Sequence, residues 1–202
     1  MGHAAPKLPT TGAEFLEWEA KQTVRHEFPG GIVVRHEFTG TEIVAMAGAS
    51  EAHVTLAGNV YLALRQHLAG SPCRTFIVDM RLYVEATDAY CYPDVVVCCG
   101  LADTSDPLVK RSPLLLVEVL SPSTAACDRG EKFAAYRSLA GLREVLFIDP
   151  NTRRSELFRR GSDGLWVLHP VEADEPVSLQ SVELSITAAA LWAEVPPAEA
   201  RQ

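Results

Sequence analysis

The sequence of 202 residues lacks the long apolar segments that mark membrane and exported proteins. No apolar run approaches the roughly 18 residues that a membrane-spanning helix needs. The first ten residues, MGHAAPKLPT, contain no apolar core of the signal-peptide kind. We therefore expect a cytoplasmic protein that makes no contact with a membrane.

Several catalytic and metal-binding signatures are also missing. There is no G-x-S-x-G nucleophile elbow, so serine hydrolase chemistry finds no support. The five cysteines form no C-x-x-C pair, and their number is odd, which disfavours a zinc site and a disulfide framework. We expect them to be buried thiols. They are Cys73, Cys91, Cys98, Cys99 and Cys127.

Basic charge is scarce overall but unevenly distributed. The net charge of −8 argues against a protein that coats nucleic acid non-specifically. Residues 129–160, however, hold eight Lys and Arg against four Asp and Glu, whereas residues 161–202 hold one Arg and seven acids. Two interpretations stay open for residues 129–160: a local basic patch, or a solvated face laced with salt bridges. No helix-turn-helix or zinc-finger motif is visible.

Hydrophobic periodicity predicts a mixed arrangement of helices and strands. Helices are expected from Thr11, over 50–70 with Ser50 as its N-cap, and over about 129–140. Strands are expected at 74–85, 92–99, 114–120, 144–149, 154–160 and 165–171, with a last amphipathic segment at 185–194. This order favours an α/β or α+β fold with a mixed central sheet. We expect a disordered N-terminus (1–10), a single domain (11–195) and a tail (196–202).

Two further patterns concern residues 24–68. VRHEFPGGIV (24–33) is followed at once by VRHEFTGTEIV (34–44), a near-repeat too short for a solenoid, and each copy is typical of a short strand with a glycine turn. A hairpin is the simplest expectation. Within 50–70, an apolar stripe at helical spacing predicts the buried face. Its members are Val54, Ala57, Val60, Leu64 and Leu68.

Two predicted strands each carry one carboxylate among apolar residues. Glu118 lies within LLLVEVL, on the same strand face as Leu116 and Leu120, and Asp94 directly precedes VVVCC. If the strands are neighbours, the two carboxylates converge and repel unless a cation lies between them. A hard divalent metal would satisfy this pair. Each acid could instead lie at a strand end and be hydrated, an explanation that suits Asp94 better than Glu118.

The segment after Glu118 supplies a candidate cation. Asp128 and Glu131 have the D-x-x-E spacing of a capping box, which would place Lys132 in the first turn of a helix. A lysine there faces the positive end of the helix dipole, which is mildly unfavourable. Its presence at this position is therefore best explained by a nearby carboxylate or other anion. Tyr136 lies one turn further along the same face. An ordinary surface lysine is the alternative interpretation.

Four ordered blocks, YPDVVV, LLLVEVLSPST, DRGEKFAAY and REVLFIDP, resemble the Uma-type family of restriction endonucleases, a branch of the PD-(D/E)XK nuclease superfamily. HEFTGTEIVAMAGASEAH (36–53) is similar to the N-terminal block of that family, and the resemblance runs from about Phe15 to about Trp192. The second copy of the tandem repeat fits this block better than the first. The resemblance implies a mixed sheet flanked by helices, with the active site where the sheet strands splay apart.

The resemblance also implies roles for particular residues. Asp94 and Glu118, with the backbone carbonyl of Val119, would bind Mg²⁺ or Mn²⁺. The superfamily pattern calls for a lysine two residues after the glutamate, where this chain has Leu120, and Lys132 would take its place from the following helix. Accessory candidates near the metal are Glu51, His53 and Tyr136.

The expected activity is metal-dependent phosphodiester hydrolysis in nucleic acid, most simply DNA, by a homodimer that can cut both strands. Candidate phosphate contacts are Arg129, Arg137, Arg153 and Arg154. Two rival functions remain. One is a nuclease-like fold that has lost catalysis and binds nucleic acid or protein. The other is a glycosidase-like pair of carboxylates, which would leave Lys132 without a role.

Overall fold

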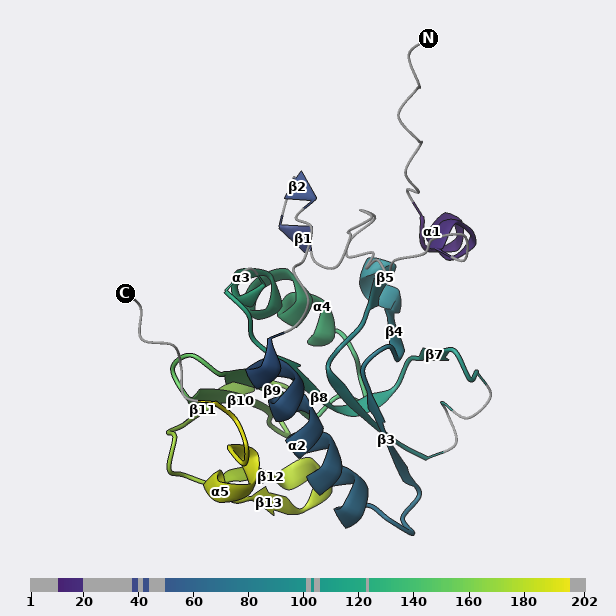
Figure 1. Cartoon of the computed structure of the whole chain (residues 1–202). Coiled ribbons are helices and arrows are strands. Elements are labelled where there is room, and N and C mark those ends of the chain that lie inside the picture. The colour runs from purple at the N-terminus through teal and green to yellow at the C-terminus, as the bar shows by residue number, and fades with distance from the viewer. Residues whose placement is uncertain are drawn as a thin grey trace.

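The computed structural model describes residues 11–19, 38–39, 42–43, 50–100, 103, 106–122 and 124–196. Within this part of the chain, a six-stranded sheet forms the centre of the structure (Figure 1). Neighbouring strands are antiparallel except for β8 and β9, which are parallel. The expected mixed central sheet is therefore confirmed. In spatial order the strands are β11 (Trp166–Val171), β10 (Arg154–Arg160), β9 (Glu144–Asp149), β8 (Pro113–Val119), β6 (Val95–Cys99) and β3 (Cys73–Ile77).

The alternation of side chains along β8 divides the core into two layers. Leu115, Val117 and Val119 lie in one hydrophobic cluster with residues of α2 (Glu51–His67). Leu116 and Leu120 lie in the other, with residues of the segment that connects β8 to β9. This connection is the helical crossover that a parallel strand pair requires. Both faces of the sheet are covered, which explains why β6 and β8 are apolar along nearly their whole length.

Helix α2 begins at the predicted cap. The Ser50 side chain accepts a hydrogen bond from the backbone N–H of His53 at 3.2 Å. The predicted apolar stripe is wrong at Val54, whose exposed fraction is 59 %, because the buried face is rotated toward Leu56. The helix packs against the sheet beside α5 (Ala188–Leu191) and the strand pair β12 (Val177–Leu179) and β13 (Leu184–Ile186) (Figure 1).

The crossover between β8 and β9 is one continuous helical stretch with a π-helical middle. It consists of α3 (Ala125–Cys127), η3 (Asp128–Lys132) and α4 (Phe133–Tyr136). The expected capping box at Asp128 and Glu131 is wrong, because the backbone N–H of Asp128 already donates to the carbonyl of Thr124 at 2.9 Å. The helix starts earlier than the capping pattern suggested, so Lys132 does not lie in its first turn.

Smaller elements complete the described chain, and some differ from expectation. The predicted strand 74–85 is two strands, β3 and β4 (Arg81–Val84), because Val78 and Asp79 have positive φ angles of 41° and 71°, which interrupt the extended backbone. The predicted segment 185–194 is β13 followed by α5. Other elements are α1 (Gly12–Glu19), β1 (Phe38–Thr39), β2 (Glu42–Ile43), η2 (Glu85–Thr87), β5 (Ala89–Cys91), β7 (Val109–Lys110) and η4 (Gln180–Val182).

The N-terminal expectations can be checked only in part. The N–H of Glu14 donates to the Thr11 side chain at 3.2 Å, as predicted for the start of the first helix. β1 and β2 pair antiparallel inside the second copy of the tandem repeat, whereas the first copy, residues 1–10 and the last six residues lie outside the described residues. The division into one domain stays a prediction. None of the helices that the structure describes is long and apolar enough to cross a membrane.

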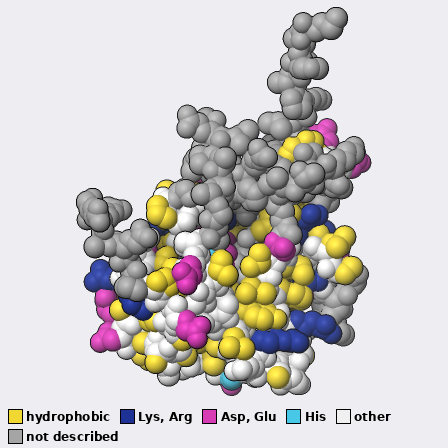
Figure 2. Space-filling view, in the orientation of Figure 1, with side chains coloured by type: hydrophobic (Ala, Val, Ile, Leu, Met, Phe, Trp, Pro, Cys, Tyr) yellow, Lys and Arg dark blue, Asp and Glu magenta, His cyan; other side chains and the backbone are white. Residues whose placement is uncertain are grey.

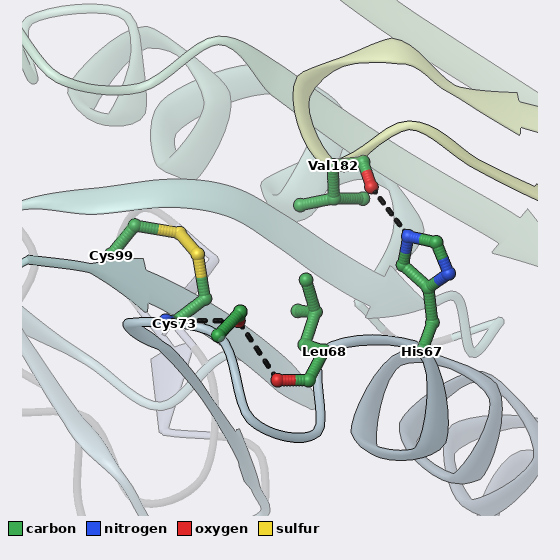
Figure 3. The surroundings of a disulfide bond; sticks show 6 residues. His67, Leu68, Cys73, Cys99 and Val182 are labelled. Atoms are coloured by element: carbon green, nitrogen blue, oxygen red, sulfur yellow. Dashed lines mark hydrogen bonds between the residues drawn. A yellow bond between two sulfur atoms is a disulfide. The ribbon is translucent and has the colours of Figure 1, made fainter.

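A disulfide bond joins Cys73 to Cys99, which corrects the expectation of five thiols (Figure 3). The two residues are direct cross-strand partners at the ends of β3 and β6. This register brings together residues that are 26 positions apart in the sequence, and the sequence alone does not reveal it. The other three cysteines are buried thiols, as expected: Cys91, Cys98 and Cys127.

Loss of this disulfide is expected to destabilise the fold by about 3 kcal/mol, because the bond restricts the unfolded chain over a loop of this length. Urea unfolding of the wild type with and without a thiol reductant measures the difference. The double variant Cys73→Ser/Cys99→Ser is the control and should unfold identically in both buffers. A wild type that is indifferent to reductant would contradict the prediction.

Candidate active site

Of the two carboxylates singled out in the sequence, Glu118 lies in β8, and Asp94 directly precedes the neighbouring strand β6. β6 and β8 pair antiparallel, with Val95 opposite Val117. Continued by one residue, this register places Asp94 opposite Glu118, at the point where the ladder between the two strands ends. Asp94 contacts α2 on one side of the sheet, whereas Glu118 contacts the crossover on the other side. The structure therefore brings the two acids to the same end of the strand pair.

Asp94 is held by one contact from a helix and one from a strand. Its Oδ1 lies 2.9 Å from Nε2 of His53, in the first turn of α2, and its Oδ2 accepts a hydrogen bond of 2.7 Å from the backbone N–H of Val119. The aspartate side chain thus replaces the next backbone partner of Val119 in the ladder. His53, expected only as an accessory residue, directly contacts a predicted metal ligand.

Pro93 explains why the ladder ends here. Continued by two residues beyond its last pair, the β6–β8 register places Pro93 opposite Val119, on the side to which the Val119 N–H points. In an antiparallel pair, the opposite residue would return an N–H to the Val119 carbonyl. Proline has no N–H, so it cannot provide this donor. The proline of the PD motif therefore keeps the strand ladder from using the carbonyl that the family resemblance implies as a metal ligand.

Glu118 is a buried carboxylate on the apolar face of β8, with an exposed fraction of 4 %. Its Oε1 accepts a hydrogen bond of 2.6 Å from the Tyr136 hydroxyl and lies 3.8 Å from Nζ of Lys132. Tyr136 and Lys132 both come from the crossover that follows β8. The negative charge of Glu118 is thus balanced by a hydroxyl donor and an ammonium group from the crossover, as burial of a carboxylate requires.

Lys132 is itself almost fully buried, with an exposed fraction of 2 %, so it is not an ordinary surface lysine. Its Nζ lies 3.1 Å from Oδ1 of Asp128, one helical turn earlier and also buried, which is closer than Glu118. The π-helical segment places both side chains toward the sheet. Sequence reasoning assigned Asp128 only to a cap, although its spacing of four residues from Lys132 was a visible signal of a pair.

The remaining candidates are not brought into this cluster by any contact among the described residues. Glu51 is exposed in the first turn of α2. The four predicted phosphate-binding arginines have other partners: Arg129 pairs with Glu156 and Arg154 with Glu172, while Arg137 lies over the Phe133 ring and Arg153 over the Trp192 ring. These contacts favour the salt-bridged interpretation of residues 129–160. On the face shown in Figure 2, Lys and Arg side chains lie in separate small groups among acidic and hydrophobic ones.

The donor chemistry of the cluster fits a hard divalent cation. Asp94 and Glu118 offer carboxylate oxygens at the end of the strand pair β6–β8, where the ladder between the two strands stops. Within the described chain, no group of three or more His, Cys, Asp and Glu side chains is arranged to hold a metal. Mg²⁺ does not need such a cage, because it commonly binds through one or two carboxylates and completes its shell with water and substrate oxygens. The residues present are therefore compatible with Mg²⁺ or Mn²⁺.

The His53–Asp94 pair is expected to make the stability of the metal-free protein depend on pH. Burial lowers the pKa of His53, but the hydrogen bond and the negative charge of Asp94 raise it, and the net result is a pKa above the ordinary 6.5. Because the folded-state pKa exceeds the unfolded one, this stabilisation is complete below pH 6.5 and is lost as the pH rises through the folded-state value.

Urea unfolding of wild type and His53→Gln in the presence of a chelator, at pH values from 5.5 to about 8.5, tests this expectation. The wild type should lose more stability than the variant over that range. His67→Gln is a matched control on the same helix, since the His67 ring lies 2.8 Å from a backbone carbonyl, that of Val182, instead of a carboxylate (Figure 3). Parallel profiles for wild type and His53→Gln would refute the assignment.

Comparison with known proteins agrees with this fold. A family model named Uma2, described as "Putative restriction endonuclease", matches residues 13–190. Two proteins of Synechocystis sp., both named as uncharacterized, are related: slr1290 is 31% identical over 182 residues (90% of each chain), and sll1609 is 34% identical over 160 residues (78% of this chain and 85% of the relative).

A solved structure shares the fold. The crystal structure of a "putative nuclease belonging to DUF820" from Anabaena variabilis has a TM-score of 0.73 and 16% identity, covering 91% of this chain and 98% of that one. At this identity the likeness concerns the fold, which is that of restriction-endonuclease-like nucleases. The match of nearly the whole chain to one family model and the two curated relatives settle its membership: the chain belongs to the Uma2 family.

Proposed function

We propose that the protein is a metal-dependent endonuclease that hydrolyses phosphodiester bonds in nucleic acid, most simply DNA. The observation that carries the proposal is the position of Asp94, directly before β6, at the same end of the strand pair as Glu118 of β8, with the buried Lys132 ammonium 3.8 Å from Glu118. The description of the family as restriction endonucleases and of the similar crystal structure as a nuclease supports the same class of activity. A glycosidase-like reaction gains no support from them, and it gives Lys132 no role.

In this proposal, Asp94, Glu118 and the carbonyl of Val119 hold Mg²⁺ or Mn²⁺. A metal bound there would polarise a phosphate oxygen and lower the pKa of a bound water. The Tyr136 hydroxyl orients Glu118 through its hydrogen bond of 2.6 Å. Lys132, between two carboxylates, is suited to orient the attacking water and to offset negative charge that develops on the phosphate.

In this proposal, contacts with DNA phosphates would come from arginines of residues 129–160. Arg129 and Arg154 would have to exchange an acidic partner for a phosphate, so they are weaker candidates than their positions in the sequence suggested. Arg137 and Arg153, stacked on aromatic rings, can still direct guanidinium N–H groups outward. Cutting both strands of a duplex calls for two sites, and we propose a homodimer for that reason.

A second candidate is a nuclease-like fold without catalysis that binds nucleic acid or a protein partner. Two observations favour it: both oxygens of Asp94 already accept hydrogen bonds within the protein, and the usual lysine position is the buried Leu120. Calorimetry with Mn²⁺ separates the two candidates. Binding that is abolished in Asp94→Asn supports the enzyme, whereas an absence of binding supports the inactive fold.

Cleavage of supercoiled plasmid DNA with Mg²⁺ or Mn²⁺ tests the activity itself. Asp94→Asn, Glu118→Gln and Lys132→Met are each expected to reduce the rate about 100-fold or more, because each removes a contact that is worth several kcal/mol in the transition state. A chelator should abolish cleavage by the wild type. Glu131→Gln, an exposed acid in the same helical stretch as Lys132, is the control and should cut normally. Equal rates in all variants would exclude this site.

A further inference from the structure

Asp128 is a buried charge in the site that the proposed chemistry does not use. Its exposed fraction is 1 %, and its Oδ1 lies 3.1 Å from Nζ of Lys132. The contact is an ion pair but not a hydrogen bond, since this oxygen has no hydrogen-bond partner among the described residues. A buried carboxylate oxygen without a hydrogen bond lowers the stability of the fold, so its presence calls for an explanation.

The two simplest roles for Asp128 do not fit the structure. It is no helix cap, because its N–H donates to the Thr124 carbonyl and its backbone φ of −60° and ψ of −47° are helical. It completes no three-residue metal site in the described chain. A merely stabilising ion pair is also a poor explanation, since burial of two charges costs about as much as their attraction returns. Among the described residues, the charged partner within ion-pair distance of Asp128 is Lys132.

The positions of the two carboxylates around Lys132 indicate what Asp128 does. Asp128 approaches the ammonium from the helix at 3.1 Å, and Glu118 approaches it from β8 at 3.8 Å. The closer charge dominates the position of a flexible lysine side chain, because Coulomb attraction falls with distance. Without Asp128, the ammonium is drawn into hydrogen-bond contact with Glu118, where it competes with a metal ion for the same carboxylate.

We infer that Asp128 is the positioning residue of Lys132: it holds the ammonium away from Glu118 so that Glu118 stays available to a divalent cation. The inference rests on the proposed function, because it assigns Glu118 to the metal. In this role Asp128 binds neither the metal nor the substrate itself. It acts through Lys132, and its effect must therefore disappear when Lys132 is absent.

Calorimetric titration with Mn²⁺ measures this effect without any substrate. Asp128→Asn is expected to weaken Mn²⁺ binding about 10- to 100-fold, the range typical of residues that orient a ligand from behind. Asp128→Glu retains the charge and should recover most of the affinity. Glu131→Gln removes an exposed charge from the same turn and should bind Mn²⁺ like the wild type.

The decisive comparison is Asp128→Asn in a Lys132→Met background. If Asp128 acts through Lys132, the added substitution changes Mn²⁺ affinity less than about twofold there, since the cation it restrains is gone. If the charge of Asp128 attracts the metal directly, affinity falls by the same factor in both backgrounds, and the inference is overturned. Plasmid cleavage with the same variants should show the same loss of the Asp128 effect in the Lys132→Met background.

Thermal unfolding in the presence of a chelator separates this inference from the proposed function. Lys132→Met leaves two buried carboxylates facing each other, so the double variant should have a higher Tm than Lys132→Met alone. If the wild type neither binds Mn²⁺ nor cleaves DNA but this recovery is observed, the proposed function fails while the pairing of Asp128 with Lys132 stands. Additive Tm changes would show that the two residues are not coupled and would overturn the inference.

Discussion

The buried carboxylate of Glu118 is the constraint around which the site is organised. A charge in the middle of an apolar strand is tolerated only if hydrogen-bond donors and a cation reach it. Both come from the crossover helix, through the Tyr136 hydroxyl and the Lys132 ammonium. The parallel pairing of β8 with β9 requires a connection of this kind, which returns across the face to which Glu118 points. The sheet topology thus places Tyr136 and Lys132 next to the carboxylate that needs them.

The sequence predicted this layout where local patterns were strong. The continuous apolar strands, the Ser50 cap and the single carboxylates before β6 and in β8 could all be identified, because they depend on residues close together in the chain. The predictions were wrong or incomplete where the position of a residue depends on a partner that is distant in the sequence. The pairing of Cys73 with Cys99 follows from strand register, and the position of Lys132 follows from a helix that starts earlier and passes through a π-helical turn. The contact of His53 with Asp94 depends on how α2 crosses the sheet.

The distribution of charge indicates that binding of nucleic acid would depend on the site rather than on a basic surface. Of the four arginines predicted to bind phosphate, two pair with acids of β10 or of the chain after β11, and two stack on aromatic rings. An acidic protein with paired surface cations gains little non-specific attraction for phosphate, so contacts that form only in the bound complex would have to supply most of the affinity. A divalent metal is the natural source of positive charge in such a protein, because it offsets the carboxylates and the phosphate together.

The π-helical turn has a consequence for how this site can vary between related chains. A π-helical turn holds one residue more than the α-helical turn it replaces, so it accommodates that residue without rotating the helix that follows. Removal of a single residue between Asp128 and Lys132 would restore an α-helical turn and leave the two at a spacing of three. Residues three apart still lie on one face of an α-helix. A relative that keeps both residue types at a spacing of three would therefore retain the pair on the same helix face.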